Sequence, residues 1–368
     1  MKLGFFTMPI HPLDKDWRTS LAEDREAFVL ADELGFAEAY VGEHVTDKAE
    51  NITSSTVFLA WIASATRRIR LGTGTVNVPN RHPAAIAGEI AMLDHMLDGR
   101  LIFGISPGGL ASDAEAFGNL DLDRNALFVE GIDAVLAIWA SEAPYDVDGR
   151  HWTISTRRTM FPEIGQGVMS RPLQQPHPPI VVTVVAPHSK GVSEAAARGW
   201  EPISANFLLP QWVASHWPRY VEGCARGGRA ADPSAWRVAR SIFVADDINT
   251  ARDYVYSYSS PYRFYFAQLL AKMKKHGRTN LFKEDASVSD DDLTVDYVLD
   301  RCVIWGTPDK VADEVMALRE RVGDFGTLLY AGKDWADRNL GRRSMILLAE
   351  KVLPRIAAVA GPDAAAAE

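Results

Sequence analysis

The chain has 368 residues, 47% of them hydrophobic and 24% charged, and a formal net charge of −9 at pH 7. This acidic balance, with no basic run, argues against a nucleic-acid partner. No apolar run approaches the roughly 18 residues that a membrane-spanning helix needs, so no membrane association is predicted. Its two cysteines, Cys224 and Cys302, lack metal-ligand spacing, and Met1 leads into a strand without a signal-peptide pattern. We therefore expect a cytoplasmic protein without a metal site.

The hydrophobic pattern predicts strands and helices that alternate about every 30–35 residues in the first third of the chain, which indicates a parallel sheet. Strands are expected at Lys2–Phe6, Ala37–Val41, Ile69–Val76, Leu101–Ile105, Ile180–Val185, Glu201–Ser204, Trp236–Val244 and Gly326–Tyr330. Helices are expected at Trp17–Leu34, Ser54–Thr66, Ala84–Leu97, Phe128–Trp139, Ser189–Arg198, Gln211–Arg226, Asp309–Arg321 and Arg338–Val359.

Eight such strands fit an α/β fold of the (β/α)8 TIM-barrel type with insertions. A doubly wound, two-domain protein is the alternative, and the lack of a G-x-G-x-x-G motif after the first strand lowers it. We expect one barrel domain over residues 1–360, with an insertion at about 141–179 and a lid-like polar stretch at about 257–299. Residues 361–368 are predicted to form a mobile tail.

Two residues lie where predicted strands end, which is where barrel enzymes carry their active sites, and a third feature lies inside a predicted strand. His44 follows the second strand and could carry a proton near neutral pH, or could bond a neighbouring loop. Asp113 follows the fourth strand, either as an N-cap or as an acid that faces a ligand. Gly74 and Thr75 interrupt the third strand, as expected where a flat ring approaches the backbone or where a barrel strand kinks. His82 is interpreted as a residue that bonds the backbone at a helix N-terminus.

A second group follows the fifth strand and opens a helix. Ser189, Lys190 and Gly191 offer a hydroxyl, an ammonium group and backbone N–H groups at the predicted helix N-terminus, which suits an anion such as phosphate. A plain serine N-cap is the alternative. Motifs of common hydrolases and metalloenzymes (GxSxG, H-E-x-x-H, Walker A) do not occur in the sequence.

Several motifs together resemble the bacterial luciferase-like flavin monooxygenases. They are G-E-H at Gly42–His44, L-G-T-G at Leu71–Gly74, P-N-R-H-P at Pro79–Pro83, L-D-H-M-L-D-G-R at Leu93–Arg100, F-G-I-S-P-G-G at Phe103–Gly109, A-S-D at Ala111–Asp113 and G-T-P at Gly306–Pro308. The similarity extends to the branch of the diketocamphane and limonene monooxygenases through S-P-G-G-L-A-S-D-A at Ser106–Ala114, R-S-I-F-V-A-D at Arg240–Asp246 and N-L-F at Asn280–Phe282.

The resemblance implies a TIM barrel that binds FMN at the carboxyl ends of its strands. The flavin ring would lie against Gly74 and Thr75, where family members often carry a non-proline cis peptide. His44 would assist proton movement around a flavin peroxide, and Asp113 would lie near the flavin. Ser106 stands where luciferase has a cysteine, and the phosphate would bind Ser189 and nearby amides.

For function, the resemblance implies a two-component monooxygenase that receives FMNH2 from a separate NAD(P)H:flavin reductase and uses O2 as co-substrate. Aromatic residues available near the rim indicate a small hydrophobic organic substrate. Baeyer–Villiger oxygenation of a cyclic ketone and hydroxylation or epoxidation of a terpene-like compound both remain open. A homodimer is expected, because the family commonly dimerises through the helices at 54–66 and 84–97. The alternatives are an F420-dependent oxidoreductase on the same barrel and a flavin-binding protein without turnover.

Overall fold

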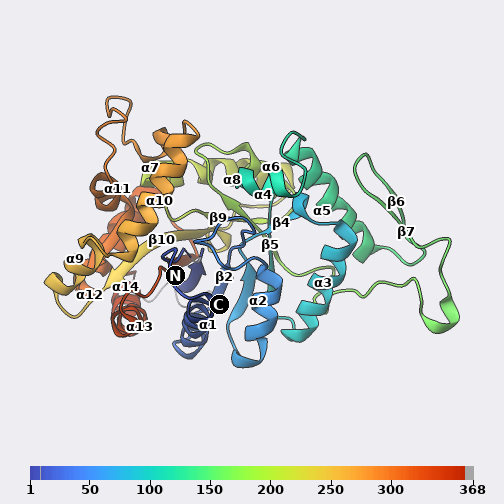
Figure 1. Cartoon of the computed structure of the whole chain (residues 1–368), viewed down its shortest axis with the longest axis horizontal. Helices are drawn as coiled ribbons and strands as arrows, with labels where there is room; N and C mark the ends of the chain where they lie inside the picture. The colour runs from blue at the N-terminus through green and yellow to red at the C-terminus, as the bar shows by residue number, and fades with distance from the viewer. Residues whose placement is uncertain (9, 361–368) are drawn as a thin grey trace. The chain divides into compact units, whose positions relative to one another are not determined.

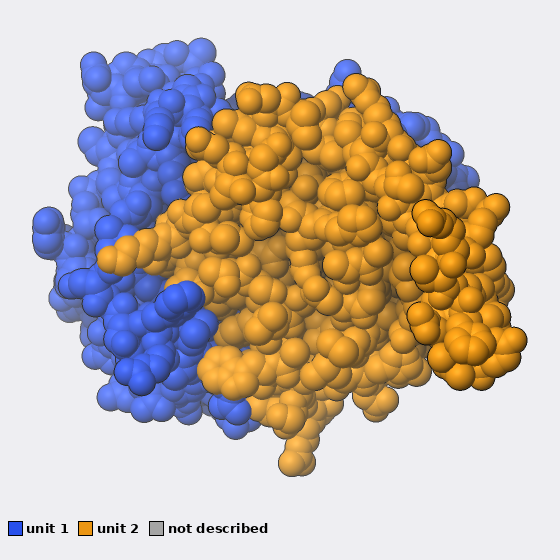
Figure 2. All heavy atoms as spheres, turned by 45° about the vertical axis from the view of Figure 1, so that its right-hand side comes forward, with its two compact units in different colours: residues 1–39, 182–368 blue, residues 40–181 orange. Residues whose placement is uncertain are grey.

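The computed structural model describes residues 1–8 and 10–360, so the tail predicted at 361–368 lies outside the described residues. The chain forms two compact units, one of residues 1–39 and 182–368 and the other of residues 40–181 (Figure 2). We call them unit 1 and unit 2. Each unit contains parallel strands with helices packed beside them (Figure 1).

The strands of unit 1 pair in parallel around β10. They are β1 (Lys2–Thr7), β9 (Glu201–Ser204), β10 (Arg237–Val244), β11 (Val303–Gly306) and β12 (Thr327–Ala331). β12 pairs with both β1 and β10, and β10 pairs also with β9 and β11. Every residue of β10 is buried, as expected for a strand covered on both faces.

In unit 2, β5 (Leu101–Ser106) pairs in parallel first with β3 (Arg70–Thr73) and then with β4 (Val76–Asn77). The predicted third strand is thus interrupted at Gly74 and Thr75, whose peptide bond is cis. Gly104 in β5 is required by packing, since a Cβ there would lie 1.8 Å from the carbonyl oxygen of Thr73.

Two more strands, β2 (Glu38–Val41) and β8 (Ile180–Val184), complete the sheet. In the described part of the chain the strand order is β10-β12-β1-β2-β3-β5-β8-β9, and β9 pairs back to β10. This closed ring of parallel strands confirms the predicted (β/α)8 TIM barrel.

The helices follow the strands, mostly where the sequence predicts them. They are α1 (Trp17–Glu33), α2 (Ser55–Ile62), α3 (Pro83–Met96), α4 (Ala111–Ala116), α5 (Arg124–Ala140), α6 (Lys190–Ala197), α7 (Pro210–Ala214), α8 (His216–Arg226), α9 (Ile248–Tyr256), α10 (Pro261–Lys275), α11 (Val295–Cys302), α12 (Pro308–Val322), α13 (Arg338–Leu347) and α14 (Leu353–Ala360). His82 accepts a hydrogen bond from the Ala84 N–H as the N-cap of α3, which confirms its structural interpretation. Across residues 1–8 and 10–360, no helix combines the length and apolarity that crossing a membrane requires.

Some elements differ from the prediction. The helix expected at 211–226 is two helices, α7 and α8, which meet at Ser215. The Ser215 hydroxyl donates to the Trp212 carbonyl and accepts from the His188 N–H, so it competes with the helical hydrogen bonds at that point. The final helix contains a π-helical segment at Leu348–Val352. Helix α9 was not predicted.

The two stretches predicted as an insertion and a lid have structure of their own. The stretch 257–299 contains α10 and the start of α11. The insertion contains an antiparallel ribbon of β6 (Asp146–Asp148) and β7 (Thr153–Ser155), visible beside α5 in Figure 1. The Glu130 carboxylate of α5 holds it by accepting hydrogen bonds from the His151 and Trp152 N–H groups at 2.7 and 3.0 Å.

Candidate active site

A histidine and an aspartate from different strand ends meet in unit 2. His44 lies just after β2, and Asp113 lies in α4, which follows β5. Nδ1 of His44 is 2.8 Å from Oδ2 of Asp113, and the two side chains are only 13% and 3% exposed. The structure thus brings together the two residues predicted to be catalytic.

The other oxygen of Asp113 holds the loop that carries His44. Oδ1 accepts hydrogen bonds from the Val45 N–H (3.1 Å), the Thr46 N–H (2.9 Å) and the Thr46 hydroxyl (2.7 Å). Burial would raise the pKa of Asp113, but the hydrogen bonds from His44 and Thr46 outweigh it and lower the pKa to about 2. Because an ionised carboxylate can only accept, Nδ1 of His44 carries the proton that is donated to Asp113.

A second carboxylate faces the other ring nitrogen of His44, and sequence reasoning missed it. Oε2 of Glu50 lies 3.5 Å from Nε2 of His44, and the Glu50 side chain is 2% exposed. The imidazole of His44 therefore lies between two carboxylates, those of Asp113 and Glu50. Glu50 lies in the loop after β2, in a stretch without a motif, so only the folded loop reveals it.

Glu43 has a structural role instead. Its Oε2 accepts hydrogen bonds from the Ser55 N–H (2.8 Å) and hydroxyl (2.6 Å) at the N-terminus of α2, where negative charge is favourable. A cavity of about 190 Å³ lies beside His44 and Asp113, and its lining includes Arg81 and Phe117. A small molecule fits this space.

Hydroxyl groups gather next to the cis peptide between Gly74 and Thr75. The Thr75 hydroxyl donates to Oγ of Ser106 at 2.6 Å, and the Ser106 hydroxyl donates to Oδ1 of Asn77 at 3.0 Å. The Gly108 N–H also donates to Oγ of Ser106 at 3.1 Å. Three predicted flavin contacts, Gly74, Thr75 and Ser106, therefore form one polar cluster at the ends of β3 and β5.

The predicted phosphate residues lie in unit 1 at the start of α6. Ser189 is the N-cap residue, but its side chain makes no capping hydrogen bond. Lys190 and Gly191 form the first turn and are exposed. The first N–H groups of a helix have no intrahelical acceptor, so this turn offers donors to an anion together with the Ser189 hydroxyl.

Lys333, also in unit 1, was not singled out from the sequence. It lies two residues beyond β12, and its Nζ is 3.9 Å from the ring centre of Tyr265 in α10 and 3.3 Å from the Ala331 carbonyl oxygen. Burial lowers its pKa to about 7. Its Nζ also donates to the Gly332 carbonyl at 3.4 Å, and no carboxylate of the described residues pairs with it.

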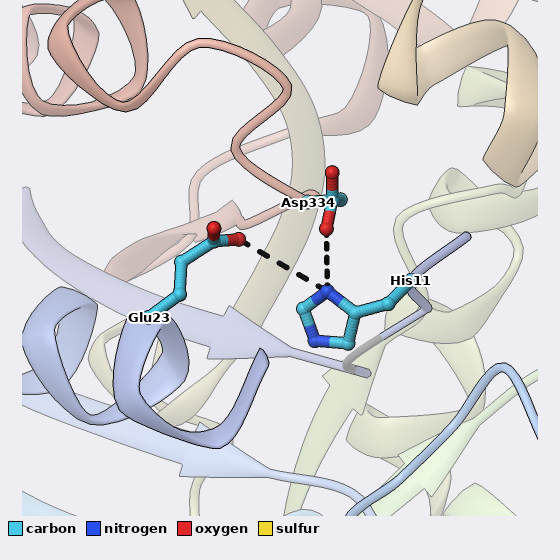
Figure 3. A group of neighbouring side chains, drawn as sticks. All are labelled: His11, Glu23 and Asp334. Atoms are coloured by element: carbon cyan, nitrogen blue, oxygen red, sulfur yellow. Dashed lines mark hydrogen bonds and ion pairs between the residues drawn. The ribbon is translucent and has the colours of Figure 1, made fainter. Parts of the chain in front are cut away.

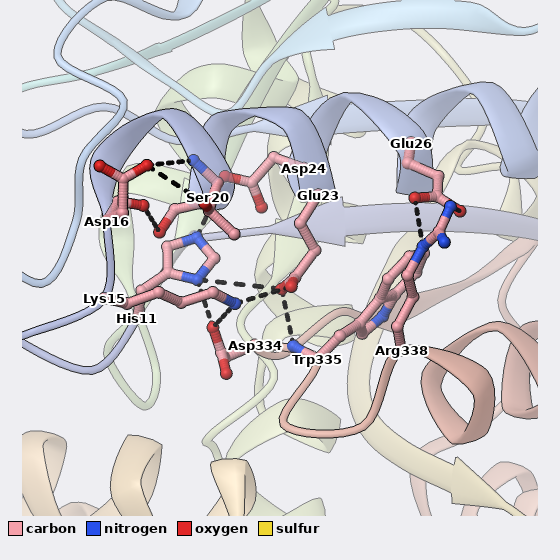
Figure 4. Close-up of polar contacts among 11 residues, drawn as sticks. His11, Lys15, Asp16, Ser20, Glu23, Asp24, Glu26, Asp334, Trp335 and Arg338 are labelled. Atoms are coloured by element: carbon pink, nitrogen blue, oxygen red, sulfur yellow. Dashed lines mark hydrogen bonds and ion pairs between the residues drawn. The ribbon is translucent and has the colours of Figure 1, made fainter.

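One group of potential metal ligands occurs in unit 1, formed by His11, Glu23 and Asp334 (Figure 3). Lys15 lies among them, with Nζ 2.6 Å from Glu23 and 2.5 Å from Asp334 (Figure 4). His11 bonds Asp334 through Nδ1 (2.6 Å) and Asp24 through Nε2 (3.1 Å). The Lys15 ammonium provides the positive charge that a metal ion would bring, so this geometry favours a network of ion pairs.

Comparison with known proteins agrees with this geometry. Residues 1–324 match the family described as luciferase-like monooxygenase. The chain belongs to this family. It is 33% identical to 4-hydroxyprotoasukamycin monooxygenase of Streptomyces nodosus subsp. asukaensis, across 96% of the chain and 92% of that protein. It is 28% identical to limonene 1,2-monooxygenase of Rhodococcus erythropolis, across 98% of the chain and 87% of that protein.

Among solved structures, the chain is similar to a type II Baeyer–Villiger monooxygenase, the oxygenating constituent of 3,6-diketocamphane monooxygenase of Pseudomonas putida, in complex with FMN. The TM-score is 0.87 and the identity 25%, across 97% of this chain and 98% of that chain. This protein is therefore a luciferase-like monooxygenase, an oxidoreductase on a TIM barrel, and its similar relatives include a flavin-binding enzyme.

Proposed function

We propose that this luciferase-like monooxygenase uses FMNH2 and O2 to transfer one oxygen atom to a hydrophobic organic substrate. The observation that carries the proposal is the buried pair of His44 and ionised Asp113 at strand ends of a barrel of this family. A separate NAD(P)H:flavin reductase would supply the reduced flavin, in keeping with the relative that is described as an oxygenating constituent.

The donor groups fit FMN at both predicted contact regions, the one for its phosphate and the one for its ring. The Ser189 hydroxyl and the first N–H groups of α6 suit a phosphate, and the hydroxyl cluster of Thr75 and Ser106 suits the polar edge of a flavin ring. Bound FMN would supply the redox chemistry with O2. Asp113 would fix the orientation of His44, and Nε2 of His44 would hold or deliver the proton that oxygen transfer requires.

Reconstitution tests this function. The protein is combined with NADH, FMN and a flavin reductase, and cyclic ketones, terpenes and aldehydes are screened for O2-dependent products. Oxygen uptake with FMNH2 is compared with that of the same protein given reduced F420, whose deazaflavin does not activate O2. Substrate-dependent oxygen uptake with FMNH2 supports the proposal. Substrate reduction with F420 and no oxygen uptake favours the F420-dependent alternative, and flavin binding without turnover favours the non-catalytic one.

The phosphate contact gives a separate prediction. Replacing Ser189 and Lys190 together by alanine should lower the affinity for FMN at least tenfold and change the affinity for riboflavin little, because only FMN carries the phosphate. Fluorescence titration of both flavins measures this. Equal losses for the two flavins would show that the phosphate binds elsewhere.

Lys333 gives a prediction about the substrate class: if the substrate binds beside Tyr265, the Lys333 ammonium group would donate to a carbonyl oxygen but gain nothing from a plain hydrocarbon. At pH 6, below the lowered pKa of Lys333, its amine is a charged donor, and a hydrogen bond from such a donor contributes roughly 1.5–3 kcal/mol. Lys333→Met should therefore weaken binding of a bicyclic ketone at that pH at least about tenfold. Binding of the same ring system without the oxygen should not change. Lys310→Met is the matched control, since Lys310 also lies over an aromatic ring, that of Trp305, but pairs with Glu314. Equal losses of affinity for the ketone and the hydrocarbon would show that Lys333 does not recognise the carbonyl oxygen.

The homodimer remains part of the proposal. Val57 and Trp61 on α2 and Met92 and Met96 on α3 are about half exposed or more, at 69%, 48%, 59% and 49%. Large apolar side chains gathered on neighbouring exposed helices mark interaction surfaces. Light scattering in solution gives the mass that decides between one chain and two.

A further inference from the structure

A cavity of about 240 Å³ in unit 1 belongs to none of the groups described above. It lies among β10, β11, α11 and α12, and its lining includes three arginines, Arg240, Arg301 and Arg321. Clusters of arginine around a cavity are typical of sites for anions.

Arg240 is the most deeply placed of these residues, at 2% exposed in the middle of β10. Its Nη1 donates to the Leu208 carbonyl at 2.5 Å, but its Nη2 is buried and has no hydrogen-bond partner. Burial lowers the pKa of Arg240 to about 10, so the group is still a cation at neutral pH. The neighbouring thiol of Cys302 cannot compensate this charge, because burial raises its pKa to about 12.

Arg301, at the end of α11, also lines the cavity and carries a second donor without a partner. Its Nη1 and Nη2 bond the Tyr297 carbonyl (3.2 Å) and the Glu284 carboxylate (3.0 Å), whereas its Nε is buried without a partner. Buried donors are almost always satisfied in folded proteins. Two unpartnered guanidinium nitrogens on one cavity therefore indicate an acceptor that comes from outside the chain.

The cavity also contains two carboxylates, but both have other partners. Asp300 accepts a hydrogen bond from the Tyr256 hydroxyl at 2.6 Å, and Glu314 pairs with Lys310. Neither forms an ion pair with Arg240 in the described part of the chain. Their negative charges would repel a polyanion, so an anion with a single negative charge is the ligand that fits.

We propose that this cavity binds a small carboxylate anion, with Arg240 and Arg301 as its donors. A carboxylate offers two oxygens to two N–H groups and one charge to a buried cation that lacks a counter-ion. A volume of about 240 Å³ accommodates such an ion with some water. This site is separate from the proposed oxygenation chemistry and does not depend on it.

Acetate is the probe. Saturation transfer from the wild-type protein to the acetate methyl group should be observed by NMR, and acetate should raise the melting temperature at constant ionic strength. Arg240→Met should weaken acetate binding at least tenfold and remove the rise in melting temperature.

Arg343→Met is the matched control, because Arg343 is exposed and pairs with Asp246, and it should bind acetate like the wild type. If Arg240→Met does not fold, Arg301→Met decides, since it removes only one donor and should also weaken acetate. Equal acetate effects on the wild type and on both cavity variants, or no acetate binding by the wild type, would overturn the proposal.

Discussion

Replacing His44 by alanine should lower product formation by about 10²–10⁴-fold, the usual contribution of one acid–base group, and leave folding and flavin affinity nearly unchanged. Folding should survive because Asp113 keeps its three hydrogen bonds from Val45 and Thr46. Oxygen consumed without product should then appear as H2O2. The ratio of product to oxygen consumed, measured with a saturating reductase, reports this uncoupling.

His95→Ala is the control, because His95 is an exposed histidine whose Nε2 bonds the Arg171 carbonyl, away from Asp113. Asp113→Asn should impair product formation as well, since an amide can donate to Nδ1 and move the imidazole proton to Nε2. Unchanged coupling in the His44→Ala protein would exclude the imidazole from proton delivery.

The free energy of unfolding of the wild type, minus that of His11→Gln, should fall by up to about 3 kcal/mol as pH rises from 6.5 to 9. Burial would lower the pKa of His11, but its bonds to Asp24 and Asp334 outweigh it and raise the pKa to about 9. A group whose pKa is raised on folding stabilises fully below its unfolded pKa, and the effect is lost as pH rises through the folded value.

Urea unfolding of both proteins at a series of pH values measures this difference. Lys333 titrates in the opposite sense, because its lowered pKa makes stability rise with pH above about 7, but it is common to both proteins and cancels. A difference that does not vary between pH 6.5 and 9 would mean that His11 is neutral in the folded protein.

Much of the barrel was predictable because buried parallel strands leave a strong local signal. Glu201–Ser204 was predicted to the residue, and most other strands to within one or two residues at each end. The helices within 257–299 were obscured by the run of aromatic residues near Tyr254, which has no clear period, and by the charged segment after it. The break between α7 and α8 lies three residues before Pro218, whose missing N–H is a sequence signal for a helix boundary, whereas the contact of Ser215 with His188 appears only in the folded chain.

The candidate site was predictable where a motif marks it. His44 and Asp113 are 69 positions apart, and two arguments suggested that they could meet: parallel strands end on one side of a barrel, and the family resemblance places both residues near the flavin. Glu50 and Lys333 have no motif, because each is defined by what the fold places around it. The roles of Ser189, Lys190 and Gly191 as phosphate ligands remain a prediction.

The two carboxylate oxygens of Asp113 bond different partners, and this has a consequence for engineering the enzyme. One oxygen orients the imidazole and the other anchors the turn at Val45 and Thr46. Reshaping that turn to admit a bulkier molecule would also tilt the ring that handles protons. Variants with broader selectivity should therefore be sought first among residues that do not touch this aspartate.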